Sequence, residues 1–181
     1  MERSLEEVRA ILQRFQDGYT ARDVSQLDEF MTLFAPDEDI ELIGIGAAKR
    51  AATEWFMGPP AIRDIVEGDW TYWGDVKLEV AGAQIHVRGE VAWLSTTGAV
   101  VQTQAFDKAL PQYLQQMKAI LENNEFDPDT QLMEATHFGM RRLRERSKGL
   151  KHAWPFTFVA VLVNAGDQWR FHTIHWSMPV D

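Results

Sequence analysis

The chain has 181 residues, 45% of them hydrophobic and 25% charged, which suits one globular domain with a sizeable core and excludes a disordered composition. Its net charge of -9 argues against nucleic acid or an anionic membrane as the main partner, because both attract basic proteins. It holds no cysteine, so disulfides, thiolate nucleophiles and cysteine-bound metals are excluded. The N-terminal residues 1–7 are charged, and the longest apolar run, 158–163, is far shorter than the roughly 20 residues of a bilayer span. We therefore expect a cytoplasmic protein without a membrane partner.

The first part of the sequence predicts three helices and one short strand. Apolar residues recur at helical spacing from residue 4, and Gly18 is expected to end the first helix. Asp23 or Ser25 can begin the second helix, and Pro36 ends it. The expected elements are helices at 4–16, from 23 or 25 to 34, and from 58–60 to 68–70, with a strand at 40–45.

The remainder is predicted as strands interrupted by one helical block. The expected strands are 77–80, 84–88, 91–101, 156–163 and 168–178, with a hairpin turn at 164–167. Between them, residues 107–148 form two amphipathic helices, the second capped by Asp127. We expect this block to pack on the outside or the mouth of the fold through Leu110, Leu114, Met117, Leu132, Met133 and Phe138.

The last two strands are apolar on both sides. Phe156, Phe158 and Ala160 alternate with Val159 and Val161, which are also apolar. A strand with two apolar faces is buried on both. If helices cover one face, a second copy of the chain is the simplest cover for the other, so we expect a homodimer through the sheet.

Three stretches of the sequence occur in an order that is informative about the fold. They are Asp39–Gly44 with Trp55–Gly58, then Gln84–Trp93, then Trp169–Pro179. In this order they resemble SnoaL-like domains of the nuclear-transport-factor-2-like superfamily, and the last two are also similar to the association domain of calcium/calmodulin-dependent protein kinase II. The resemblance covers residues 5–102 and 154–180, and the block 107–148 departs from it.

The resemblance implies an α+β fold in which a cone-shaped, curved antiparallel sheet packs on N-terminal helices, with a helical insertion at about 107–148. It also implies a single domain over residues 1–181 that often holds a small organic molecule. Such domains include polyketide cyclases, ketosteroid isomerases, dehydratases and members without catalysis, so the fold alone does not name a reaction. Two hypotheses stay open: a protein that binds a small, largely apolar molecule, with or without catalysis, and a non-catalytic assembly module with a filled pocket.

Aromatic residues supply the candidates for a ligand site. Seven tryptophans are many for this length, and aromatic walls with a few polar groups suit a small apolar ligand. Alternatively, they fill a core and a dimer interface. The expected pocket residues are Tyr19, Trp55, Trp70, Trp73, Trp93, His86 and His175.

Three residues are candidates for proton transfer. His86 and His175 lie mid-strand, where a neutral imidazole can act as a base or simply satisfy a backbone group. Asp17 lies near Tyr19, and a Tyr–Asp pair is what the resemblance to isomerases and dehydratases implies. Helix capping or a solvated helix face explains this aspartate equally well.

We expect neither a metal nor a cofactor. His172 and His175 are three apart on a strand, so they point to opposite faces and cannot share a metal. There is no glycine-rich phosphate loop or nucleophile elbow, and the basic run from Arg141 to Lys151 is typical of a solvated helix face.

Overall fold

The structure is a computed structural model and describes residues 2–47, 49–51, 54–103 and 106–179. The chain forms two compact units. Residues 1–100 and 153–181 form one, here called the sheet unit, and residues 101–152 form the other, here called the helical hairpin. No helix of the described residues is both long and apolar enough to cross a membrane.

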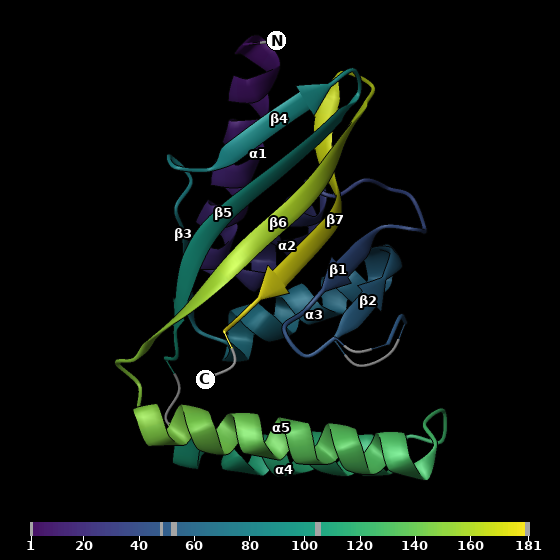
Figure 1. Cartoon of the computed structure of the whole chain (residues 1–181), viewed down its shortest axis with the longest axis vertical. Coiled ribbons are helices and arrows are strands. Elements are labelled where there is room, and N and C mark those ends of the chain that lie inside the picture. Colours follow the sequence, from purple (N-terminus) through teal and green to yellow (C-terminus); the bar gives the residue numbers. More distant parts are fainter. Residues whose placement is uncertain (1, 48, 52–53, 104–105, 180–181) are drawn as a thin grey trace. The chain divides into compact units, whose positions relative to one another are not determined.

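The sheet unit is built on one curled, open sheet of seven strands (Figure 1). Its order is β2-β1-β7-β6-β5-β3, and β4 pairs with β5. The strands are β1 (Glu41–Ile43), β2 (Trp55–Met57), β3 (Asp75–Leu78), β4 (Gln84–Arg88), β5 (Val91–Val101), β6 (Ala153–Ala165) and β7 (Gln168–Ser177). The predicted curved sheet packed on N-terminal helices is confirmed, and one of its pairings, that of β1 with β7, is parallel.

Two backbone features shape the long β6–β7 hairpin. Gly166 and Asp167 both have positive φ, the conformation that a two-residue hairpin turn requires, so the predicted turn is confirmed. A bulge then shifts the register, since Val161 pairs with Thr173 while Leu162 pairs with Phe171. His172 is the extra residue, and the simple alternation that would place His172 and His175 on opposite faces does not hold across it.

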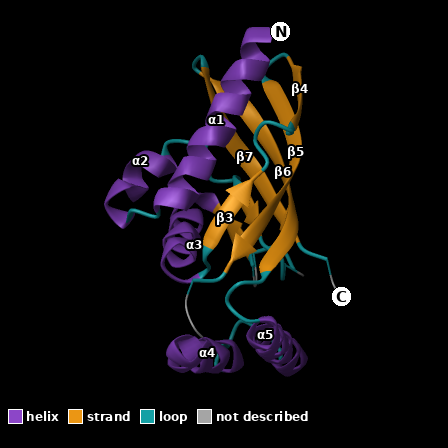
Figure 2. Ribbon diagram, turned by 90° about the vertical axis from the view of Figure 1, so that its left-hand side faces the viewer, coloured by secondary structure: helices purple, strands orange, loops and turns teal. Residues whose placement is uncertain are grey.

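Helices α1 (Glu2–Ala21), α2 (Leu27–Met31) and α3 (Gly58–Tyr72), with the short helix η1 (Val24–Gln26), cover one face of the sheet (Figure 2). The first helix does not end at Gly18. A Cβ at Gly18 would lie 2.4 Å from the Phe30 ring and 3.3 Å from the Trp70 ring, so this glycine permits close packing of helices rather than a cap. The chain leaves the helix one turn later, where Arg22 has a positive φ.

The core lies between these helices and the inner face of the sheet, and its largest side chains are aromatic rings. Phe15 of α1 contacts Phe158 of β6 and Phe171 of β7, with ring centroids 5.4 and 5.2 Å apart. Trp176 of β7 lies 4.8 Å from Phe158 by the same measure. Because such rings bury large apolar areas, this cluster holds the sheet unit together.

The helical hairpin consists of α4 (Phe106–Leu121) and α5 (Pro128–Lys148), as predicted. The Asp127 side chain accepts a hydrogen bond of 2.9 Å from the Thr130 N–H, so the expected cap of α5 is confirmed. The helices contact each other through Tyr113 and Phe138, whose ring centroids are 6.2 Å apart. Four apolar side chains of the hairpin are exposed: Leu110, Leu114, Leu132 and Met133.

Candidate functional site

The predicted pocket residues divide between the two faces of the sheet unit. Tyr19, Trp70 and Trp73 lie on the helix side and pack with the core. Trp93, His86 and His175 occupy strand positions that alternate with more buried ones and therefore belong to the outer face. Trp55 belongs to the same face because it pairs with Ile43, which in turn pairs with His175. The structure does not bring these two groups together, so they cannot line one cavity.

The outer-face candidates form cross-strand rows. His86 pairs with Trp93, and their rings stack with centroids 5.4 Å apart. In a second row, His175 pairs with Ile43 on one side and with Val159 on the other. Trp93 is 40% exposed and Val159 is 43% exposed, so apolar groups face solvent on this side of the sheet.

On the inner side, Tyr19 projects from α1 into the aromatic core. It is 1% exposed, and its hydroxyl donates a hydrogen bond of 3.0 Å to Oδ2 of Asp69 on α3. Burial raises the pKa of Tyr19 well above its usual value, and the charge of Asp69 and this hydrogen bond raise it further. Tyr19 therefore stays protonated at neutral pH and acts as a donor that orients the Asp69 carboxylate.

A Tyr–Asp pair thus exists, but its carboxylate is not Asp17. Asp17 lies on the exposed side of α1, where it accepts a hydrogen bond of 2.7 Å from Gln13. Asp69 was missed because it is 50 residues away from Tyr19 in the sequence. One feature could have identified it, since Asp69 falls three residues after Val66 and four before Trp73, within the apolar stripe of α3.

Two tryptophans beside this pair have buried indole N–H groups. Trp70 and Trp176 donate no hydrogen bond to any described residue. Trp176 is 2% exposed, and its ring lies 5.7 Å from Tyr19 and 5.3 Å from Trp73. A buried donor without an acceptor is unfavourable by about 1–3 kcal/mol. The indole N–H of Trp169, at the start of β7, is also buried without an acceptor. Trp70 and Trp176 differ from Trp169 because they lie beside Tyr19.

The arrangement joins apolar surface to a few polar groups. Rings enclose the Tyr19 hydroxyl, while Asp69 and Trp73 are only half-buried and reach the solvent boundary. We call this end of the core the Tyr19–Asp69 site: Tyr19, Asp69, Trp70, Trp73 and Trp176. Chemically it can stack a planar ring, donate from indole N–H groups and accept a hydrogen bond or a proton at a carboxylate.

Other candidate sites are weaker. A groove of about 400 Å³ lies along the first half of α1, but its basic residue Arg9 already donates to the carbonyl oxygens of Val80, Ala81 and Ala83. Among the described residues, no group of three or more histidine, aspartate or glutamate side chains could hold a metal ion. His172 lies 3.4 Å from Asp39, as an isolated pair.

Comparison with known proteins supports the architecture. No family model matches the sequence, and no curated protein matches it either. Solved structures match over nearly the whole chain. An NTF2-like protein of unknown function from Pseudomonas putida KT2440 has a TM-score of 0.61 at 15% identity, covering 100% of this chain and 90% of its own.

Two further matches bear on function. A protein from Streptomyces avermitilis, described as a "putative dehydratase" of the NTF2-like family, has a TM-score of 0.62 at 10% identity and covers 99% of each chain. A "putative" calcium/calmodulin-dependent protein kinase type II association domain from Thiobacillus denitrificans has a TM-score of 0.54 at 12% identity and covers 94% of each chain. At these identities the likeness concerns the fold alone. The chain therefore has the fold of the NTF2-like proteins.

Proposed function

We propose that this protein binds a small, largely apolar organic molecule with a planar ring at the Tyr19–Asp69 site. The observation that carries the proposal is the partly buried hydrogen bond from Tyr19 to Asp69, set among aromatic rings, with the ring of Trp176, whose indole N–H has no partner among the described residues, next to Tyr19. An ordinary core position rarely combines a carboxylate with a buried, unsatisfied donor, because each is costly without a partner.

The ligand class follows from these groups. A planar ring can stack beside the half-buried Trp73 side chain, which packs against Trp176 and Phe156 with ring centroids 5.3 and 6.2 Å apart. An oxygen on the ligand would accept from an indole N–H, and a hydroxyl would donate to Asp69. Phenols and aromatic ketones have this combination of an apolar body and one or two oxygens.

Any reaction at this site would be acid–base chemistry of the isomerase, cyclase or dehydratase type. Tyr19 holds the Asp69 carboxylate in place, and that carboxylate is the group that would take up a proton. The fold likeness to a protein described as a "putative dehydratase" supports this class, and binding itself does not depend on it.

The test is a fluorescence titration with a panel of planar phenols and aromatic ketones, with 2-naphthol as the first probe. Saturable quenching is expected, and Trp73→Ala and Asp69→Asn should each weaken binding at least tenfold. Trp93→Ala removes an aromatic ring from the outer face and is the matched control, with affinity unchanged. If no compound saturates, or if only Trp93→Ala weakens binding, the proposal is wrong.

A second function is favoured by the outer face. We propose that two copies of the chain associate there, since Val159, Val161 and Val163 of β6 form an apolar row and the first of these is 43% exposed. The likeness to an association-domain structure supports an assembling role. Light scattering should give at least twice the chain mass of 20.7 kDa.

Val159→Lys tests this interface directly. A lysine buried in an apolar contact without a partner costs several kcal/mol, so the particle mass should fall relative to that of the wild type. Ala10→Lys, on the exposed side of α1, introduces the same charge elsewhere and should leave the mass unchanged. A wild-type chain that is monomeric at micromolar concentration would refute the interface.

A further inference from the structure

The helical hairpin exposes an apolar row along α4. Leu110, Leu114, Met117 and Leu121 are separated by four, three and four residues, which is the spacing of a coiled-coil seam. The three leucines are exposed, and Met117 is half-buried. A seam of this period is suited to packing against another helix.

A second row runs along α5. Met133, Thr136, Met140 and Leu143 are separated by three, four and three residues, again the period of a helix-packing seam. Met140 is 66% exposed, and Leu143 and Met133 are also more than half exposed. Long helices with one unpacked apolar stripe are marginal alone, because most of a helix's stability comes from such packing.

The apolar rows of α4 and α5 face the same side of the hairpin. Tyr113 and Arg142 make the contact between the helices, with the guanidinium carbon 4.8 Å from the ring centroid. The next residue on each helix, Leu114 and Leu143, lies about 100° further round. Because the two helices are antiparallel, this equal rotation turns Leu114 and Leu143 to the same side of the hairpin. A partner must therefore cover two parallel rows at once.

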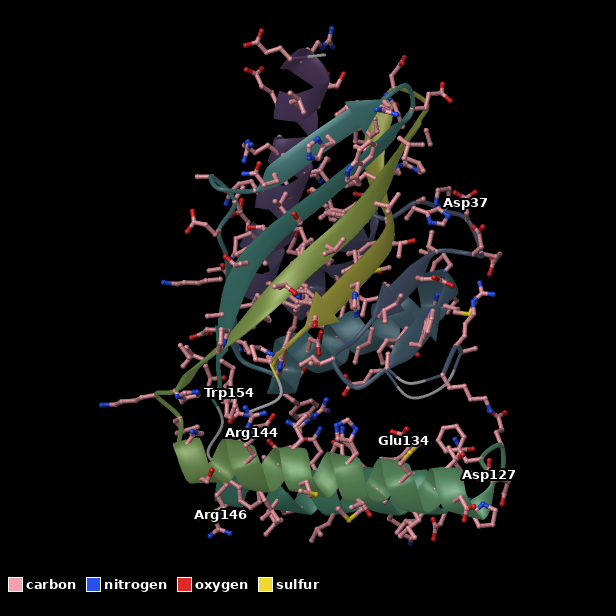
Figure 3. All side chains as sticks on the ribbon, in the orientation of Figure 1. Asp37, Asp127, Glu134, Arg144, Arg146 and Trp154 are labelled. Carbon is pink, nitrogen blue, oxygen red and sulfur yellow. The ribbon has the colours of Figure 1, made fainter. Side chains whose placement is uncertain are left out.

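Charge is divided between the two ends of the hairpin. Residues 122–134, at the turn, hold five acidic residues and no basic one, while residues 141–151 hold six basic residues and one acidic one. Figure 3 shows Asp127 at one end of the hairpin and Arg144 and Arg146 at the other. The hairpin is thus an apolar-faced rod with oppositely charged ends.

We propose that the exposed face of the hairpin binds the same face of a second copy of this chain, forming an antiparallel four-helix bundle. A two-fold axis perpendicular to the helices places the acidic end of each hairpin over the basic end of the other. It also lays α4 on α4 and α5 on α5, so both seams are covered. A hairpin with this self-complementary pattern fits itself better than it fits an anionic membrane, which its acidic end would repel.

The first test uses the particle mass of the full chain. The Val159→Lys background removes the outer-face association, and in it we expect a particle of twice 20.7 kDa at micromolar concentration. Adding Leu114→Glu with Leu143→Glu should reduce it to one chain and weaken association at least a hundredfold. Gln115→Glu with His137→Glu changes exposed residues of the same helices away from the seams, and it should leave the mass unchanged.

The second test determines the orientation of the two hairpins relative to each other. The chain has no cysteine, so Leu132→Cys near the acidic end and Leu143→Cys near the basic end each introduce a single thiol. A short thiol crosslinker should join the two variants when they are mixed. It should not join Leu132→Cys to itself, because the antiparallel axis separates those two positions.

Three outcomes would overturn the proposal. The Val159→Lys chain could be monomeric, or its larger mass could survive Leu114→Glu with Leu143→Glu. Alternatively, phosphatidylserine vesicles could bind the chain, and the two substitutions could abolish that binding without changing the mass in solution. A crosslink of Leu132→Cys to itself would contradict the antiparallel orientation.

Discussion

The inner face of the sheet consists almost entirely of buried apolar side chains, whereas the outer face mixes apolar and polar ones. On the inner face, Phe158 and Trp176 are almost completely buried among rings from the helices. On the outer face, Val159 and Trp93 are flanked by polar neighbours and lie largely open. The same strands thus stabilise the chain with one set of side chains and leave a second set for a partner, which is why the two faces should respond differently to substitution.

The largest expected effect separates the two faces on a single strand. Phe158→Ala removes a ring that contacts Phe15, Phe171 and Trp176, and it should lower the free energy of unfolding by about 3–5 kcal/mol. Its neighbour Thr157 is exposed on the outer face, so Thr157→Ala should change the free energy of unfolding by less than about 0.5 kcal/mol. Urea denaturation measures both, and equal losses would contradict the assignment of faces.

A smaller effect concerns Tyr19. Tyr19→Phe removes one buried hydrogen bond to Asp69 and should lower stability by about 1 kcal/mol at pH 7. The raised pKa of Tyr19 adds a pH dependence: above about pH 10 the unfolded tyrosine loses its proton while the folded one keeps it, so wild-type stability falls there.

The phenylalanine variant lacks this titration. The stability difference between wild type and Tyr19→Phe should therefore shrink as the pH rises from 9 to 11, when both are followed by denaturant unfolding. A difference that stays constant over this range would mean that Tyr19 is not held protonated by its surroundings.

The smallest effect is expected on the outer face. His86 stacks on Trp93 across β4 and β5, but both side chains are exposed. Cross-strand pairs of this kind contribute less than about 1 kcal/mol, so His86→Ala should shift the urea midpoint only slightly. A loss as large as that of Phe158→Ala would show that the outer face is part of the core.

Local signals in the sequence were sufficient for much of the fold. Gly166 and Asp167 mark their turn because few residues adopt positive φ, and Asp127 caps α5 through a contact only three residues away. The strand β2 was missed because Trp55–Met57 is three residues long and lies just before a Gly-Pro-Pro breaker. The parallel pairing of β1 with β7 was missed because strand composition does not name the neighbouring strand.

The candidate site was only partly predictable for the same reason. Trp70 lies on the buried face that helical periodicity predicts for α3. Tyr19 lies beyond the predicted end of the first helix, and its burial follows only because α1 continues past Gly18. His86, Trp93 and His175 lie on the more polar face of their strands, and which face of a strand turns toward the helices depends on the curvature of the sheet. Asp69 becomes visible only when α1 and α3 are placed side by side.

The most direct test of the central claim is a spectrum of the tryptophan indole N–H groups by ¹⁵N NMR, with and without a saturating planar phenol. The chain has seven tryptophans, and Trp70→Phe, Trp176→Phe and Trp93→Phe assign the peaks that matter. We predict that the Trp70 and Trp176 peaks shift on binding, as each N–H gains an acceptor, while the Trp93 peak stays in place. A shift confined to Trp93, or no shift at saturation, would contradict a ligand site on the inner face.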